Sequence, residues 1–382
     1  MGFTSRSTVI SSCIVAAALL GSAALLTAGP LNPPAGPVAP SYRTLTEVEP
    51  RIPISAATTP GDATSTFRIS QPGSYYLTGN MTGESGKAGI RVVASDVTID
   101  LNGFTLAGVA GSLHGITFSS ATVRNTTIRN GTVVGWGGSG INFNGTINPA
   151  GLIEGITARN NTLDGINAGE GGRVVNCAAS NNGGAGFDVL NEASFDHCVA
   201  TLNGTVGFSS TFGGSFSSCL ARQNATDGFG LSGGYAVVSA CTSSLNGGAG
   251  FSGSRGTFHA CDSSFNSGVG YSFSSGVVVE ECTANVNGAG GFSVISSAAL
   301  RNNNVSGGTT GILASGTDNR IEGNTVVGSS TGISVTGTGN IIVRKSVTGG
   351  TRYSIAAGNS AGPIVTAAGM AANTNPGANY DY

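Results

Sequence analysis

The chain reads CVATLNGTVGF at residues 198–208, CLARQNATDGF at 219–229, CTSSLNGGAGF at 241–251 and CDSSFNSGVGY at 261–271. Each segment begins with cysteine, has asparagine in its sixth position and ends with glycine and an aromatic residue. The segments start 20 to 22 residues apart. A fixed period of this length is typical of solenoid proteins, so the repeat decides the fold.

The same register extends along most of the chain as columns of equivalent residues. A glycine followed by a large apolar residue recurs at intervals of 20 to 26 residues. The apolar members are Ile90, Ile116, Ile141, Ile166, Phe187, Phe208, Phe229, Phe251, Tyr271, Phe292, Ile312 and Ile333. Ten residues before an aromatic member stand Cys177, Cys198, Cys219, Cys241, Cys261 and Cys282. Five residues before an apolar member stand Asn161, Asn182, Asn203, Asn224, Asn246, Asn266 and Asn287.

This repeat predicts an all-β fold, a single-domain parallel β-helix of about 12 coils with 20–26 residues each. The period is too short for a helix pair, which needs about 33 residues, and the chain has too few leucines for a leucine-rich repeat. The coil at 213–233 instead holds short alternating pieces at 215–217, 219–221 and 229–231, separated by turn-forming residues. Three such strands close one coil, and coils stack about 4.8 Å apart.

Stacking gives each column a predicted role. The aromatic residues should stack on one another inside the coil. The asparagines should sit in a tight left-handed bend and hydrogen-bond along the stack as a ladder. The glycine before each aromatic residue should supply a bend that a Cβ atom would block. The cysteine column leaves open buried free thiols, disulfides between neighbouring coils, or a metal site, although no C-x-x-C pair supports zinc.

The composition excludes several classes of protein. Charged residues make up only 9% of the chain, and the formal net charge is −2. The only lysines are Lys87 and Lys345 and the arginines are scattered, so no basic patch indicates a nucleic-acid partner. The 63 glycines follow no G-X-Y period, which excludes collagen. Apolar residues at fixed spacing argue for a folded core rather than disorder.

The N-terminus has the pattern of an export signal, because Arg6 precedes an apolar run at 10–26 that ends in small residues. The pattern fits a cleaved signal peptide or a retained anchor, and predicts a secreted or cell-surface protein. No later segment predicts a membrane span. The predicted parts are a signal peptide at 1–28, a Pro-rich linker at 29–60, an N-terminal cap at 61–89, the β-helix at 90–360 and a C-terminal tail or cap at 361–382.

Two stretches carry a resemblance to a known superfamily: DVTIDLNGFTL at 96–106 and NTTIRNGTVVGW at 125–136. They look like the first coils of right-handed parallel β-helix proteins of the pectin-lyase-like superfamily. Uncharacterised secreted bacterial members have segments similar to EPRIP at 49–53, ISQPGSYYL at 69–77 and TNPGANY at 374–380. The resemblance covers residues 41–382 and implies a right-handed coil. It implies no single activity, because the superfamily includes lyases, hydrolases, epimerases and adhesins.

Members that cleave acidic polysaccharides typically place calcium ligands and a basic residue on neighbouring coils, so the resemblance implies Ca²⁺ only if this chain is a lyase. The columns beside the cysteines and the aromatic residues hold no acids in two consecutive coils. The remaining candidates for a catalytic acid/base pair or a cation site are His259, Asp262, Glu280 and Glu281, with His259 and Glu280 predicted to be stacked neighbours. The alternative is a solvated surface patch. No metal or other cofactor is predicted.

Three aromatic residues are candidates for ligand binding by stacking on sugars: Trp136, Tyr75 and Tyr76. Trp136 takes the turn position that asparagine holds in later coils, which is compatible with exposure, although packing in the core or in a cap is favoured. The alternative for all three is packing in the core or in a cap.

Two further groups of charged residues need an interpretation. Arg129 and Glu154 are predicted to lie in adjacent coils as a surface ion pair. Asp188, Asp196 and His197 are close in sequence but are predicted to lie on different faces of the coil.

The sequence favours a secreted or surface-associated β-helix with a binding or structural role, with polysaccharide as the partner. The alternative is a polysaccharide lyase or glycoside hydrolase acting on extracellular polysaccharide. The two differ in what they require, because an enzyme needs two acids within reach of each other and a binder needs only exposed aromatic and amide groups. The sequence specifies neither the ligand nor the oligomeric state.

Overall fold

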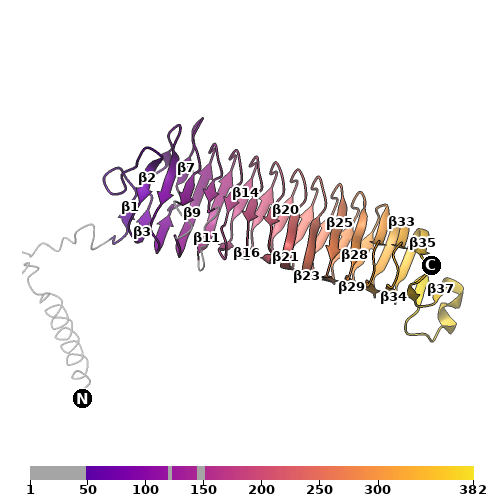
Figure 1. Ribbon diagram of the computed structural model, residues 1–382. Coiled ribbons are helices and arrows are strands. Elements are labelled where there is room, and N and C mark those ends of the chain that lie inside the picture. Colours follow the sequence, from indigo (N-terminus) through magenta and orange to yellow (C-terminus); the bar gives the residue numbers. More distant parts are fainter. Residues whose placement is uncertain (1–48, 119–122, 144–150) are drawn as a thin grey trace, which may run out of the picture. The chain divides into compact units, whose positions relative to one another are not determined.

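The computed structural model describes residues 49–118, 123–143 and 151–382. Within the unit formed by residues 51–382, short strands wind into a parallel β-solenoid of about 14 turns (Figure 1). Strands of successive coils pair in parallel, and each coil contributes a strand to each of three sheets. The predicted all-β parallel β-helix is confirmed, and the predicted number of coils, about 12, is close to the number observed.

The first sheet carries the column of aromatic and large apolar residues. Its strands are β2 (Ser65–Ile69), β5 (Ala88–Val92), β8 (Ile116–Phe118), β10 (Ile141–Asn142), β12 (Ile166–Asn167), β15 (Phe187–Val189), β18 (Phe208–Ser210), the first parts of β21 (Phe229–Ser239) and β23 (Phe251–His259), β25 (Val269–Ser275), β28 (Gly290–Ser296), β31 (Thr310–Ala314), and the last parts of β33 (Thr325–Val335) and β35 (Ser346–Ile355).

The second sheet follows the first along each coil. Its strands are β1 (Ile52–Pro53), β3 (Gly73–Tyr76), β6 (Val97–Asp100), the first parts of β9 (Thr126–Val134) and β11 (Leu152–Arg159), β13 (Arg173–Val175), β16 (Ala193–Asp196), β19 (Gly214–Ser217), the last parts of β21 and β23, β26 (Val277–Glu280), β29 (Ala299–Arg301), β32 (Arg320–Glu322), β34 (Ile341–Val343) and β36 (Ser360–Ala361).

The third sheet closes the coil. Its strands are β4 (Met81–Thr82), β7 (Thr105–Ala107), the last parts of β9 and β11, β14 (Ala178–Ser180), β17 (Val199–Thr201), β20 (Leu220–Arg222), β22 (Thr242–Ser244), β24 (Asp262–Ser264), β27 (Thr283–Asn285), β30 (Asn304–Ser306), the first parts of β33 and β35, and β38 (Asn379–Asp381). At the C-terminal end, β37 (Ile364–Thr366) pairs with β38, and a short 3₁₀ helix, η1 (Ala367–Ala372), follows β37.

The aromatic column forms the predicted internal stack. The ring centroids of Phe208 and Phe229 are 4.7 Å apart, and those of Phe229 and Phe251 are 4.8 Å apart, with nearly parallel planes. Phe216 of the second sheet meets Phe208 edge-on at 6.0 Å. Stacked and edge-on pairs are the favoured geometries of aromatic rings, so this column stabilises the register between coils as well as the core.

The six cysteines of the repeat are buried and free. Of the three alternatives for this column, the structure therefore has packed thiols. They act as small apolar side chains that fill the interior next to the aromatic stack.

The asparagine ladder is buried and continuous. Asn182 Nδ2 donates to Asn203 Oδ1 at 3.0 Å, and Asn203 Nδ2 donates to Asn224 Oδ1 at 2.9 Å. The predicted left-handed bend, however, lies one residue earlier, for example at Leu202 with φ of 57°. The reason is that the asparagine side chain must point inward to bridge two coils, so the residue before it makes the sharp turn.

The glycine before each aromatic residue has a different role from the predicted one. Gly207 does not need a left-handed backbone, but a Cβ atom there would lie 2.6 Å from the Gly228 carbonyl oxygen and 2.8 Å from Asn224 Nδ2. The glycine column is required because successive coils approach one another closely there, beside the asparagine ladder.

The parallel ladder is longer than the predicted 90–360 segment. Strand β1, within the predicted linker at 29–60, pairs with β3, and β2, within the predicted cap at 61–89, pairs with β5. The early strands follow the alternating apolar pattern of later coils, so they stack rather than cover the end. The predicted signal peptide at 1–28 lies outside the described residues. No helix in the described part of the chain is long and apolar enough to cross a membrane.

Candidate functional site

The predicted acid/base candidates lie on the outer surfaces of the second and third sheets. His259 pairs in register with Glu280, as predicted, and His259 Nε2 lies 3.9 Å from Glu281 Oε2. Asp262 is on the third sheet, where it hydrogen-bonds to Thr283. The side chains of His259 and Glu281 are 51% and 60% exposed. Such open charges have the geometry of the solvated surface patch, and no metal-binding group of three or more His, Cys, Asp or Glu residues occurs within the described ranges.

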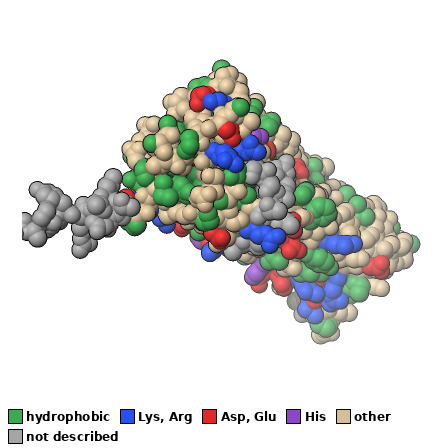
Figure 2. Space-filling view, turned by 60° about the vertical axis from the view of Figure 1, so that its left-hand side comes forward, with side chains coloured by type: hydrophobic (Ala, Val, Ile, Leu, Met, Phe, Trp, Pro, Cys, Tyr) green, Lys and Arg blue, Asp and Glu red, His purple; other side chains and the backbone are tan. Residues whose placement is uncertain are grey.

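His259 and Glu280 belong to a column of the second sheet in which basic and acidic residues alternate. Glu280 pairs in register with His259 on one side and Arg301 on the other, and Arg301 pairs with Glu322. Opposite charges on neighbouring strands attract, so the column balances itself. Figure 2 shows the charged side chains as small separate patches on a mostly uncharged surface.

Near the N-terminal end the same column contains Arg129 and Glu154, which are register partners as predicted. The predicted ion pair between them is replaced by another one. Arg129 Nη2 lies 3.1 Å from Asp100 Oδ2, and Arg51 Nη1 lies 3.2 Å from the same oxygen. Asp100 is almost fully buried. A buried carboxylate is costly unless it is paired with positive charge, so both arginines pair with Asp100.

The aromatic candidates are mostly unavailable to a ligand. Trp136 is fully buried, and its Nε1 donates to the Leu106 carbonyl at 3.1 Å, which excludes it as a stacking platform. Tyr75 is also buried, with its hydroxyl bonded to the Gln71 carbonyl. Tyr76 is partly exposed, but the Arg51 guanidinium covers its ring at 4.6 Å. For Trp136 and Tyr75, the core-packing alternative holds.

Asp188 lies on the outside of the first sheet, whereas Asp196 lies on the outside of the second. His197 Nδ1 is 3.0 Å from Asp196 Oδ1, so these two form an exposed local pair. The predicted separation therefore holds for Asp188, which lies on another face, but not for Asp196 and His197, which are neighbours.

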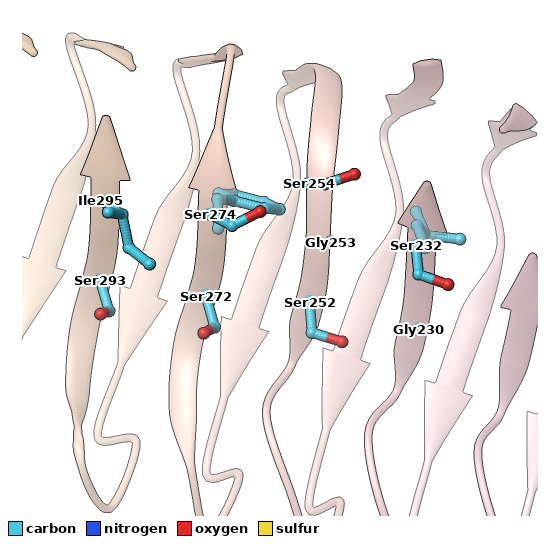
Figure 3. Close-up of a pocket in the computed structure, with 11 residues that line it drawn as sticks. Gly230, Ser232, Ser252, Gly253, Ser254, Ser272, Ser274, Ser293 and Ile295 are labelled. Atoms are coloured by element: carbon cyan, nitrogen blue, oxygen red, sulfur yellow. The ribbon is translucent and has the colours of Figure 1, made fainter. Parts of the chain in front are cut away.

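A groove of about 550 Å³ crosses the outer face of the first sheet, over β21, β23, β25 and β28. Six of its eleven lining residues are serines, and none is charged. The lining comprises Gly230, Leu231, Ser232, Ser252, Gly253, Ser254, Ser272, Phe273, Ser274, Ser293 and Ile295. Figure 3 shows these serines arrayed along four neighbouring strands.

The repeat makes this array regular. Ser252 pairs in register with Ser272, and Ser272 pairs with Ser293. Two residues later along the strand, where side chains point to the same side again, a second row has serine on β21, β23 and β25 and Ile295 on β28. The hydroxyls therefore stand about 4.8 Å apart between coils and about 6.7 Å apart along a strand.

Within the groove, Gly253 takes the inward position between Leu231 and Phe273 of the neighbouring coils. A Cβ atom at Gly253 would lie 2.3 Å from the Leu231 carbonyl oxygen, so this position can hold no side chain. The lining beside it includes Leu231 and Phe273, whose side chains are buried. At the far end Ile295, 49% exposed, adds an apolar wall. The site combines many hydroxyl groups with small apolar surfaces.

The outward column of the groove continues toward the N-terminus as a polar track. Ser209 is the register partner of Asp188, and Asp188 is that of Asn167. Asn167 Nδ2 donates to Asp188 Oδ2 at 2.9 Å. Burial raises the pKa of the Asp188 carboxyl, and the nearby charge of Asp164 raises it further, while a hydrogen bond with Ser209 opposes them. Asp188 is the one carboxyl group of the track with a raised pKa in the described residues.

The serine groove was missed in the sequence, although its signal was present. The residue after each aromatic member of the repeat is Ser252, Ser272 or Ser293 in three consecutive coils. A column of acids would indicate catalysis, whereas a column of hydroxyl groups indicates a polar binding surface. A search for any outward column of one chemical kind would have found it.

The geometry described so far can be compared with known proteins. The family described as "Right handed beta helix region" matches residues 208–326, the part of the chain that contains the groove. This chain has the right-handed parallel β-helix fold. The fold and the handedness implied by the resemblance to the pectin-lyase-like superfamily are thereby confirmed. A search of curated proteins finds no match.

Solved structures with this fold include the A-module of the mannuronan C-5 epimerase AlgE4 of Azotobacter vinelandii. It is 16% identical, with a TM-score of 0.53, and the match covers 76% of this chain and 91% of that one. The AlgE6 A-module of the same organism, also 16% identical, has a TM-score of 0.39, over 76% and 81% of the two chains. PfbA, a surface adhesin of Streptococcus pneumoniae, is 8% identical, with a TM-score of 0.38, over 72% and 85%. The similarity to the AlgE4 module concerns the fold alone.

Proposed function

We propose that this protein binds a glycan chain along the outer face of the first sheet and does not cleave it. The observation that carries the proposal is the serine groove, which has six hydroxyl groups and no charged residue in its lining. Hydroxyl groups both donate and accept hydrogen bonds, as do the hydroxyls of a sugar. Pockets of this size commonly hold small ligands through a mixture of apolar surface and a few polar groups.

The repeat supports a linear ligand. Each coil presents an equivalent set of groups at a constant interval, so a polymer of similar units can make equivalent contacts along the track. Ile295, which is 49% exposed, offers apolar surface to the less polar faces of sugar rings. The Azotobacter epimerase module, whose name describes action on a glycan, has the same fold and supports the substrate class by analogy.

A second function is a polysaccharide lyase or glycoside hydrolase, and Asp188 is the observation that favours it. Its raised pKa suits a general acid, and it stands on the track with Asp164 nearby. The lining of the groove itself contains no acid. We therefore rank binding first, and place either function outside the cell, secreted or on the surface. A requirement for Ca²⁺ belongs only to the lyase alternative.

The test uses the purified chain and a panel of neutral and acidic polysaccharides. Affinity electrophoresis measures retention, while absorbance of unsaturated products and reducing ends measure cleavage, with calcium and with chelator. Retention without products supports the binding proposal. Products that disappear in Asp188→Asn would replace it with the enzyme, and products that disappear in Glu280→Gln or Glu281→Gln would return attention to the second sheet.

A further inference from the structure

A second hollow lies on the same face, at the N-terminal end of the track. It has a volume of about 210 Å³ and is lined by Thr64, Ala88, Arg91, Leu113, His114, Thr117 and Phe118. Arg91 and Thr117 are register partners in the same outward column that leads to the serine groove. Six coils separate Arg91 from Gly230, on the order of 29 Å along the track.

Arg91 lies in register with another arginine in the neighbouring coil. Its register partner in the preceding coil is Arg68, and like charges on neighbouring strands repel. Arg68 has a counter-ion, because its Nε lies 3.7 Å from Asp62 Oδ2. Among the described residues, no carboxylate lies within 4.0 Å of the Arg91 guanidinium. A positive charge therefore faces the hollow without direct neutralisation.

The guanidinium is held in place by a short chain of hydrogen bonds. Arg91 Nη1 donates to Thr64 Oγ1 at 2.8 Å, and the same hydroxyl donates to Asp62 Oδ1 at 2.8 Å. This anchoring uses few of the five donors of the group, and the rest remain for a ligand. A planar guanidinium with free donors is suited to two parallel hydrogen bonds with a carboxylate or a sulfate.

The other walls of the hollow suit a sugar ring. Leu113 is 45% exposed, and Phe118 lies against the core with its ring stacked on Phe143. His114 Nδ1 accepts the Ser139 backbone N–H at 3.0 Å, and burial lowers the pKa of the imidazole. A neutral histidine adds no second charge, so Arg91 is the source of positive charge here.

We infer that this hollow binds an anionic sugar unit, a uronate or a sulfated pyranose, with its acidic group on Arg91 and its ring against Leu113 and Phe118. The inference rests on the proposed function, because it names the kind of unit that the glycan carries at one end of the track. It makes the track asymmetric: uncharged over the serine groove and selective for an anion at the first coils.

The experiment compares the full chain with Arg91→Gln on polygalacturonate, dextran sulfate and unmodified dextran at low salt. The wild type should bind at least one anionic polymer at least tenfold more tightly than dextran. The affinity of Arg91→Gln for that polymer should be at least tenfold lower than that of the wild type, and its affinity for dextran should be unchanged. The control Arg173→Gln makes the same charge change on an exposed arginine of the second sheet and should change neither affinity. The two anionic polymers distinguish a carboxylate from a sulfate.

Equal binding of the anionic polymer by the wild type and Arg91→Gln would overturn the inference and leave the proposed function standing. Equal affinity of the wild type for dextran and for the anionic polymers would also overturn the inference and leave the proposed function standing. Retention of none of the three polymers would overturn the proposed function as well. Arg91→Lys keeps the positive charge but loses the planar guanidinium, so its affinity for the anionic polymer should lie between those of the wild type and Arg91→Gln. This variant replaces Arg91→Gln in the test if the glutamine variant is unstable.

Discussion

The outer faces of the first and second sheets come from the same coils, and β21 and β23 contribute to both. The first presents rows of serine hydroxyls that surround a groove, whereas the second presents a column of alternating charge. On the second face the charges satisfy one another, as Glu322 does with Arg320 at 2.7 Å and Arg344 at 3.0 Å. On the first face the hydroxyls have capacity left for an external partner.

Because the two faces share one repeat but differ in chemistry, the repeat fixes where side chains point and leaves their chemistry free. Both faces rest on the same aromatic and asparagine columns, so a change on either face need not disturb the core. We therefore expect substitutions on the charged face to alter stability and substitutions on the hydroxyl face to alter binding. The predictions below test this separation, beginning with the largest effect.

Lys345 breaks the rule that charge lies outside, because it is fully buried, and its Nζ donates to the Val343 carbonyl at 2.8 Å. Burial lowers its pKa to about 6, although the charge of Glu322 opposes this. Between pH 6 and the ordinary lysine pKa the unfolded chain binds the extra proton, so stability should rise with pH. Lys345→Met should raise the free energy of unfolding at pH 7 by on the order of 3 kcal/mol.

Urea unfolding at several pH values checks this prediction. The wild type should gain stability from pH 6.5 to 8.5, by up to about 1.4 kcal/mol per pH unit, and Lys345→Met should have a flatter profile. The same profile in both proteins would show that Lys345 does not titrate in this range. Lys345→Asn is a second variant, since asparagine fills the equivalent positions Asn303 and Asn324 in the two preceding coils.

Asp100 is the buried centre of the charged face. Asp100→Asn removes the negative charge that holds Arg51 and Arg129, and should lower the free energy of unfolding by about 2 kcal/mol. Asp196→Asn makes the same change at a more exposed site of the same face and should stay within about 0.5 kcal/mol. Neither should change glycan affinity in electrophoresis. A loss of affinity in Asp100→Asn with the fold intact would break the separation of the two faces.

Ser272→Arg should block the groove. A long charged side chain in the central row fills the space between β23 and β28, and we expect at least a tenfold loss of glycan affinity, about 1.4 kcal/mol. Ser239→Arg is the matched control, because Ser239 is an outward serine on the second-sheet part of β21. Titration by affinity electrophoresis separates the two, and an equal loss in both would indicate a nonspecific effect of charge.

Glu281→Gln should have the smallest effect. Its carboxylate is 60% exposed and 3.9 Å from His259, so the free energy of unfolding should change by less than about 0.5 kcal/mol. Glycan retention should not change either. Complete loss of a cleavage activity in this variant would instead make the His259–Glu281 patch catalytic.

The sequence predicted most of the fold because a 21-residue period fixes every column at once. The register of His259 with Glu280 and of Arg129 with Glu154 came directly from counting residues. Trp136 was harder to place, because the first coils are longer. Its ring fills the interior beside Gly83 and Gly89, where a Cβ atom would lie 2.4 Å and 2.7 Å from it. The sequence alone does not show that Gly83 and Gly89 leave space for the Trp136 ring.

The candidate site was harder to predict than the fold, for a different reason. Charged residues draw attention as catalysts, yet in this chain they pair with one another on the second sheet. The lining of the groove includes Gly253, which has no side chain at an inward position. Only the register of Gly253 with Leu231 and Phe273 shows that the position is an inward one. Sequence columns give the chemistry of a face, whereas its hollows need the packing of neighbouring coils.

Hydroxyl-radical footprinting with and without glycan distinguishes binding on the two faces, because each face has an exposed aliphatic residue as a reporter. Ile295 lies in the groove and is 49% exposed, and Val237 lies on the second sheet and is 56% exposed. The account predicts that glycan protects Ile295 from oxidation and leaves Val237 unchanged. Protection of Val237 with Ile295 still reactive would contradict it and place the ligand on the charged face.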